Sequence, residues 1–253
     1  MAKKYYVVWQ GRETGIYQDW PSCKRQVDKF AGARYKSFAS LAEAEAAFGA
    51  KASSRPKAAP AAKRPRAAGL KTYQADEIAK LAAEVKIYTD GGCEPNPGEA
   101  GSGLALYRNE RLAGLWYGLY HPRGTNNSAE LNALNQALIL AQQELDKGLR
   151  VVILCDSQYA IQCLTQWADS WQKKGWKKPS GEIKNLALIQ QMYARYQLLK
   201  ARLPILHVNG HVGLEGNELA DRMSILAISE KQTEFRAYPE LSDIKALLAL
   251  RAG

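Results

Sequence analysis

Along residues 85–228, strand-like and helix-like patterns of apolar residues follow one another in an order typical of a sheet covered by helices. Alternation of apolar and polar residues predicts half-buried strands, and an unbroken apolar run predicts a strand buried on both faces. Strands are expected at 85–90, 103–107, 112–120, 151–155 and 205–208, with a hairpin between the second and third. Gly91 and Gly92 are expected to end the first strand, because glycine favours turns and close approaches of the backbone.

Helical periodicity fills the intervals between the later strands. A helix from about residue 128 to 145 places its apolar side chains along one stripe: Leu131, Leu134, Leu138, Ala141 and Leu145. A final helix is expected to extend towards Ile228, with Asn217 as its cap. Antiparallel strands first and alternating strands and helices later predict an α/β fold, with a mixed five-stranded sheet flanked by helices.

Residues 1–48 predict a separate, small α+β unit. Strand patterns at 5–9, 16–17 and 35–38 accompany a helix that Ser22 would cap, and a capping box at 40–43 opens a second helix. A unit this short is marginal on its own. Aromatic residues on its surface would be costly unless they bind a ligand.

Residues 49–72 have a different composition, rich in Ala, Pro, Lys and Arg, with seven basic residues and no acidic ones. Such a segment cannot bury enough apolar surface to fold, so residues 49–84 are predicted to be a basic linker that ends in a short helix. Residues 1–84 hold +8 of the chain's net charge of +10. This imbalance favours a polyanionic partner, although a basic surface can also serve solubility alone.

The remaining composition narrows the class of protein. No apolar run approaches the roughly 18 residues of a membrane helix, and no signal-type segment follows Met1, so a soluble, intracellular protein with no membrane partner is expected. We expect a monomer in a bacterial-type cytoplasm, and a nuclear or organellar site stays open as the alternative. The four cysteines form no C-x-x-C pair, which favours reduced thiols over a zinc site. Residues 229–253 form an extension without a motif.

Four acids occupy comparable places in the predicted fold. Asp90 and Asp156 end strands, Glu130 lies in the first turn of a helix, and Asp221 lies in the final helix. Clustered carboxylates in a partly buried site need cations, and Mg²⁺ prefers carboxylate, water and phosphate oxygens. Two such ions about 4 Å apart can activate a water and stabilise the leaving oxygen of a phosphodiester. The pattern therefore indicates hydrolysis of a nucleic acid, and the alternative is four unrelated surface acids.

The segments around these acids resemble the four signature segments of type 1 ribonuclease H. They are YTDGGC at 88–93, TNNSAEL at 125–131, CDSQYA at 155–160 and GHVGLEGNELADR at 210–222. The resemblance implies an endonuclease that hydrolyses the RNA strand of an RNA/DNA hybrid and leaves 5′-phosphate and 3′-hydroxyl ends. It also implies two Mg²⁺ ions as cofactors, for which Mn²⁺ can substitute.

The resemblance assigns each acid a role. Asp90 would bridge both ions, Glu130 and Asp156 would complete one and share in the other, and Asp221 would hold the ion that positions the water. His211 matches the family histidine that assists proton transfer or product departure. A histidine of ordinary pKa can do either near neutral pH.

Substrate contacts follow from the same resemblance. Asn96, Asn126 and Asn127 match positions that contact the RNA 2′-hydroxyl, for which amides are suited because they both donate and accept. For Asn96, between two prolines, a simple turn is the alternative. The DNA strand would be held by a phosphate pocket and by a basic protrusion at 166–178: Arg123, Thr125 and Asn185 for the pocket, and Lys173, Lys174, Trp176 and Lys177 for the protrusion.

Residues 11–38 carry a second resemblance, to the hybrid-binding domain found at the front of many type 1 ribonucleases H and in a caulimovirus viroplasmin-like inclusion protein. GRETGIY at 11–17, QVDKF at 26–30 and ARYKSF at 33–38 match that domain. The resemblance implies that Trp20 and Tyr35 contact deoxyriboses with Lys36 as a basic partner, and that double-stranded RNA is a second ligand. The alternative is that both aromatics belong to a small core.

The sequence therefore predicts a metal-dependent endoribonuclease whose front unit captures hybrids and aids processivity. Two alternatives stay open. One is a hybrid- or double-stranded-RNA-binding protein that has lost its nuclease activity. The other is an integrase- or transposase-type enzyme of similar fold, whose usual acid pattern lacks the asparagine-rich segment and the protrusion.

Overall fold

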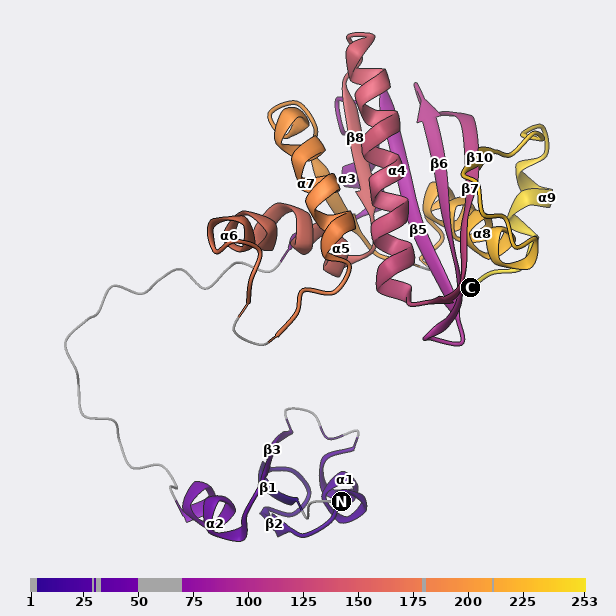
Figure 1. Cartoon of the computed structure of the whole chain (residues 1–253). Helices are drawn as coiled ribbons and strands as arrows, with labels where there is room; N and C mark the ends of the chain where they lie inside the picture. Colours follow the sequence, from indigo (N-terminus) through magenta and orange to yellow (C-terminus); the bar gives the residue numbers. More distant parts are fainter. Residues whose placement is uncertain (1–3, 29, 31–32, 50–69, 179–180, 211) are drawn as a thin grey trace. The chain divides into compact units, whose positions relative to one another are not determined.

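The computed structural model describes residues 4–28, 30, 33–49, 70–178, 181–210 and 212–253. The chain divides into two compact units, Met1–Ala67 and Ala68–Gly253 (Figure 1). Each unit has its own buried apolar core. Among the described residues, no helix is both long enough and apolar enough to cross a membrane.

The first unit is a three-stranded antiparallel sheet with two helices. Its strands β1 (Tyr5–Gln10), β2 (Gly15–Tyr17) and β3 (Arg34–Phe38) lie in the order β2-β1-β3, with helices α1 (Trp20–Val27) and α2 (Leu41–Gly49). Val8, Cys23 and Val27 are the buried apolar side chains between β1 and α1. The predicted cap of α1 was wrong: Asp19 caps the helix, and its Oδ1 accepts a hydrogen bond of 2.8 Å from the backbone N–H of Ser22.

The second unit confirms the mixed sheet. The five predicted strands form its centre, and a two-residue strand is added at each edge, giving the order β10-β7-β6-β5-β8-β9-β4. The strands are β4 (Thr72–Tyr73), β5 (Val85–Glu94), β6 (Gly98–Arg108), β7 (Arg111–Gly124), β8 (Val151–Cys155), β9 (Ile205–Val208) and β10 (Arg236–Ala237). Strand β5 pairs antiparallel with β6 and parallel with β8, so it lies at the change of direction in the sheet.

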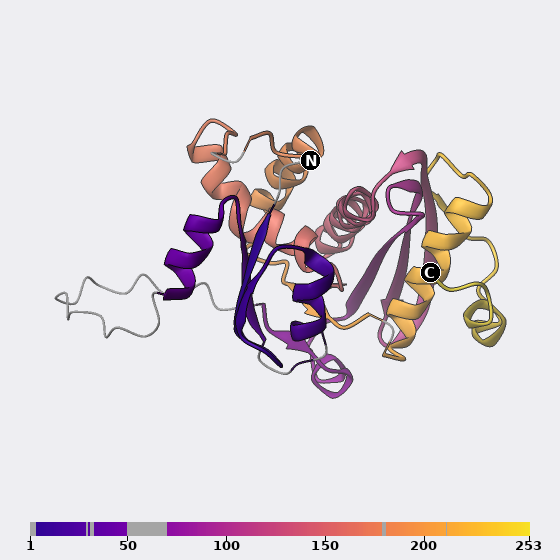
Figure 2. The same cartoon turned by 90° about the horizontal axis from the view of Figure 1, so that it is seen from below.

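Helices cover both faces of this sheet (Figure 2). The longest, α4 (Asn126–Asp146), packs on one face with α7 (Leu186–Leu199) and with the consecutive segments α5 (Gln158–Gln162), the π-helical η1 (Cys163–Trp167) and α6 (Ala168–Lys173). On the other face lie α8 (Glu215–Ser229), α3 (Ala75–Ala79) and α9 (Ile244–Leu248). Alternation along β5 sends Ile87 into the first core and Tyr88 into the second, as its pattern predicts.

Strand β5 does not end at its glycines. It continues to Glu94, with Gly91 opposite Ser102 and Gly92 opposite Gly101 on β6. The glycines instead allow helices to approach the strand, because a Cβ built at Gly91 would lie 2.2 Å from the backbone N of Glu130 in α4. The prediction of a strand end at Asp90 was therefore wrong. Asp90 lies within β5, and α4 and α8 each pack closely against this strand.

Residues at both ends of this unit also belong to the sheet. The predicted short helix is present as α3, with Ile78 buried, and Thr72 of β4, which the sequence placed in the linker, pairs with His207 of β9. At the other end, β10 pairs with β7, and Leu247 of α9 is buried in the second core. Two-residue strands have no alternation to read, which is why the sequence did not predict β4 and β10.

Candidate active site

Four carboxylates line one cavity of about 540 Å³ in the second unit: Asp90 of β5, Glu130 of α4, Asp156 after β8 and Asp221 of α8. They come from four segments that are far apart in the sequence and meet where β5 lies between α4 and α8. Helix α4 begins at Asn126 with Thr125 as its cap, so Glu130 lies in the second turn rather than the first. The close approach at Gly91 brings this turn against the strand.

Burial and mutual repulsion make these acids hard to ionise together. Burial, then the charges of Asp156 and Asp221, raise the pKa of Asp90 to about 8. Burial, then the charges of Asp90 and Asp156, hold the pKa of Glu130 well above its usual range. The cavity is therefore an electrostatically unfavourable place for four negative charges unless a cation accompanies them.

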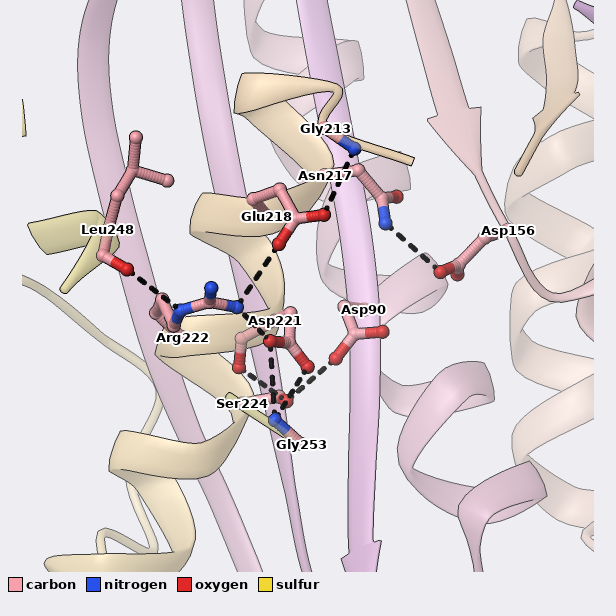
Figure 3. Close-up of polar contacts among 10 residues, drawn as sticks. All are labelled: Asp90, Asp156, Gly213, Asn217, Glu218, Asp221, Arg222, Ser224, Leu248 and Gly253. Atoms are coloured by element: carbon pink, nitrogen blue, oxygen red, sulfur yellow. Dashed lines mark hydrogen bonds and ion pairs between the residues drawn. The ribbon is translucent and has the colours of Figure 1, made fainter. Parts of the chain in front are cut away.

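Side chains from α8 hold two of the acids in place (Figure 3). The hydroxyl oxygen of Ser224 lies 2.7 Å from Oδ2 of Asp90 and 2.9 Å from the backbone oxygen of Asp221, so its one proton can bridge to either acceptor. Nδ2 of Asn217 donates to Oδ2 of Asp156 over 3.1 Å. Asn217 was predicted to cap this helix, but α8 begins at Glu215 and the Asn217 side chain is buried against the site. Sequence reasoning missed both supporting roles.

Asp221 has partners of its own (Figure 3). Its carboxylate forms an ion pair with the neighbouring Arg222, and it accepts from the backbone N–H of Gly253 at 3.2 and 3.3 Å. Arg222 also reaches Glu218 at 3.3 Å. The charge of Asp221 is therefore partly balanced within the protein, in contrast to the charges of Asp90 and Glu130.

The donor atoms fit a hard divalent cation. Glu130, Cys155 and Asp156 each offer one ligand atom, and these atoms lie within 4.8 Å of one another. Oε2 of Glu130 is buried and has no hydrogen-bond partner among the described residues. Burial, then the charges of Glu130 and Asp156, raises the pKa of the Cys155 thiol well above its ordinary value. A soft sulfur atom is also a poor match for a hard ion. The remaining oxygen donors are the type that Mg²⁺ prefers.

Of the three residues predicted to contact the 2′-hydroxyl, one lines this cavity. Asn126 lines it, and the backbone N–H of Asn126 donates to Oδ1 of Asn96 over 3.2 Å, which joins the β5–β6 turn to the start of α4. Asn127 is exposed in the first turn of α4. His211 lies outside the described residues. Gly210 lines the cavity.

A second cavity, of about 450 Å³, collects all three residues predicted to hold a DNA phosphate: Arg123, Thr125 and Asn185. His121 and Ser128 also line it and were not predicted. Thr125 caps α4, and its Oγ1 accepts from the backbone N–H of Ser128 at 3.1 Å. Backbone N–H groups at a helix start and a nearby arginine favour an anion.

The basic protrusion is only partly free to bind a ligand. Trp176 packs edge-on against Tyr193 with ring centroids 6.0 Å apart, and Lys173 forms an ion pair of 2.7 Å with Asp169. Lys174 and Lys177 are exposed. These two lysines are therefore better placed than Lys173 to meet a phosphate.

In the first unit, the two predicted contact aromatics are on the surface. Trp20 is 39% exposed and Tyr35 is 46% exposed, with their ring centroids 5.8 Å apart. Nζ of Lys36 lies 5.5 Å from the centroid of the Phe38 ring. The exposure argues against the alternative that Trp20 and Tyr35 form a core.

Comparison with known proteins agrees with this geometry. The RNase H family profile matches residues 82–229, and the ribonuclease H1 N-terminal domain profile matches residues 4–48. Human ribonuclease H1 is 31% identical over 87% of this chain and 87% of its own length. Ribonuclease H of Methylorubrum extorquens is 34% identical over 64% of this chain and 69% of its own length.

Solved structures show the same fold. The PFV RNase H domain superposes with a TM-score of 0.51 at 22% identity, covering 60% of this chain and 98% of that one. LC9-RNase H1, described as a type 1 RNase H with the type 2 active-site motif, superposes with a TM-score of 0.50 at 25% identity, covering 62% of this chain and 79% of that one. The chain therefore belongs to the ribonuclease H family, as a homologue of ribonuclease H1 in which an N-terminal hybrid-binding domain accompanies the RNase H domain.

Proposed function

We propose that this protein hydrolyses the RNA strand of RNA/DNA hybrids, using divalent metal ions held by Asp90, Glu130, Asp156 and Asp221. The observation that carries the proposal is the shared cavity of these four acids, in which a buried oxygen of Glu130 has no partner among the described residues. Family membership supports the same reaction class.

The chain's own residues would prepare this site. When bound, two Mg²⁺ ions would supply the counter-charge of the acids, polarise the scissile phosphate and lower the pKa of the attacking water. Ser224 and Asn217 would keep Asp90 and Asp156 in one orientation, so little rearrangement would be needed on binding. Hydrolysis would leave a 5′-phosphate and a 3′-hydroxyl, and His211 would assist proton transfer or product departure.

Two groups of residues outside the acid cluster would distinguish the RNA strand from the DNA strand. Asn96, Asn126 and Asn127 would contact the 2′-hydroxyls that only RNA carries. Arg123, Thr125 and Asn185, which share the second cavity, would hold a phosphate of the DNA strand. The exposed Trp20 and Tyr35, with Lys36, would hold the hybrid at the first unit and raise its effective concentration through the linker.

One incubation series tests the reaction. The full chain is mixed with Mg²⁺ and labelled RNA/DNA hybrid, duplex DNA, duplex RNA or single strands, and the products are separated and their ends typed. We expect cleavage of the RNA strand in the hybrid alone, with 5′-phosphate ends, and no cleavage in EDTA. Asp90→Asn should lose cleavage but keep hybrid binding, whereas Asp146→Asn, an exposed acid at the end of α4 far from the cavity, should keep both.

Two results would count against the proposal. Normal turnover by Asp90→Asn at ordinary Mg²⁺ would remove the role of the acid cluster. Tight hybrid binding by the unaltered protein without any cleavage would favour the alternative of a binding protein that lacks nuclease activity.

A further inference from the structure

The edge strand β4 is connected to the active site through one buried histidine. Thr72 of β4 pairs with His207 of β9, and Oγ1 of Thr72 lies 2.8 Å from Nδ1 of His207. Nε2 of the same ring lies 3.1 Å from the backbone oxygen of Asp156. His207 is only 5% exposed, so both ring nitrogens are fixed by these partners and not by solvent.

The backbone oxygen of Asp156 sets the direction of both hydrogen bonds of a neutral His207 ring. A backbone carbonyl can only accept, so Nε2 of His207 must carry the proton that it donates to Asp156. In the neutral ring Nδ1 is then an acceptor, and the hydroxyl of Thr72 donates to it. The result is a directed chain from the Thr72 hydroxyl through His207 to the main chain of an active-site acid.

Asp156 is the residue that these hydrogen bonds would hold in place. Strand β8 ends at Cys155, so Asp156 has left the sheet and no longer has strand pairing to fix it. Asn217 holds its side chain, and His207 holds its backbone oxygen. Because misplacement of a catalytic group by about 1 Å can cost about 100-fold in rate, a second anchor on Asp156 would matter for catalysis.

We propose that His207 and Thr72 are positioning residues that set the place of Asp156, which makes β4 part of the catalytic apparatus. The inference rests on the proposed function. Thr72 lies outside residues 82–229, the part that matches the RNase H family profile, so this anchor is supplied by a segment that the sequence assigned to the linker. The alternative is a purely structural role, in which the two residues only attach β4 to the sheet.

A pair of substitutions at one position separates these roles in the full chain. Thr72→Val keeps the branched shape that favours a strand but loses the hydroxyl, whereas Thr72→Ser keeps the hydroxyl. His207→Gln is a second test, because the amide retains a donor but no ring to bridge Thr72 and Asp156. The measurements are kcat and KM on the hybrid, Mg²⁺ affinity by calorimetry without substrate, and the melting temperature.

Loss of a supporting hydrogen bond around a metal ligand typically costs about 10–100-fold in metal affinity or activity, and Thr72 acts one step further away. We therefore expect Thr72→Val to lower kcat and Mg²⁺ affinity by about 3- to 10-fold, with KM within about twofold, and Thr72→Ser to restore both. His207→Gln should likewise lower kcat and Mg²⁺ affinity.

The result that overturns the inference is a Thr72→Val protein that melts earlier but binds Mg²⁺ and turns over like the unaltered protein when folded. Equal losses in the valine and serine variants would overturn it as well. The unaltered protein in the same series reports on the proposed function: if it fails to cleave, both ideas fall, and if it cleaves while the variants match it, only the positioning role falls.

Discussion

Replacing Asp90 with asparagine should stabilise the metal-free protein at pH 8, even though Asp90 is buried at the centre of the site. Its pKa is raised to about 8, while the unfolded chain titrates near the ordinary value of 3.8. Between these values the folded protein binds a proton that the unfolded chain lacks. The free energy of unfolding therefore falls as the pH rises through this range.

The size of the effect follows from the same two values. The difference between about 8 and 3.8 corresponds to on the order of 5 kcal/mol, which is the ceiling because local relaxation and water entry reduce such penalties. We expect Asp90→Asn to raise the free energy of unfolding by about 1–3 kcal/mol at pH 8 in EDTA. For a unit of this size that is roughly 3–10 °C in melting temperature. The asparagine oxygen can still accept from Ser224.

Urea and thermal unfolding between pH 4 and pH 8, with EDTA and then with Mg²⁺, measure this directly. The gain should vanish near pH 4, where the wild-type carboxyl is also protonated. Added Mg²⁺ should stabilise the wild-type protein more than the variant, because it binds the folded site. Asp169→Asn is the control: a hydrogen bond from Lys173 lowers the pKa of this exposed acid, so its loss should not stabilise. An Asp90→Asn protein no more stable than wild type at pH 8 would refute the inferred repulsion.

Three further predictions concern packing, support and binding. Gly91→Ala should cost about 1–3 kcal/mol of stability in urea unfolding and most of kcat, because α4 must retreat by about 1.2 Å to reach an ordinary contact of 3.4 Å. Gly92→Ala, whose three nearest contacts are side chains of α8, should cost less stability. Asn217→Ala should lower kcat about 10- to 100-fold with KM little changed in steady-state kinetics, and a rise in KM alone would contradict its role beside Asp156. Trp20→Ala should weaken hybrid binding by about 1–3 kcal/mol in a titration, while single-turnover cleavage at saturating enzyme stays unchanged.

Sequence patterns were most informative where one side-chain property dominated. Strand β8 begins and ends where its apolar run does, since burial on both faces leaves little choice of boundary. The four acids share a cavity as their motifs implied. These features depend on local composition, which a single sequence contains.

The sequence predictions were wrong or incomplete where contacts between distant segments determine the structure. Glycine commonly ends strands, but Gly91 continues β5 because α4 needs the space that a side chain would fill. Asn217 is a good cap by type, yet its amide is used by Asp156, which is 61 residues away in the sequence. The link from Thr72 through His207 depends on a two-residue edge strand that has no periodicity of its own.

The most direct test of the central claim is a crystal structure of the protein with Mn²⁺, with data collected at the manganese absorption edge. The account predicts anomalous peaks in the cavity, bonded to carboxylate oxygens of Asp90, Glu130, Asp156 and Asp221, and weakened or absent in Asp90→Asn crystals. A cavity without anomalous density at saturating Mn²⁺, in a protein that still cleaves the RNA strand, would contradict it.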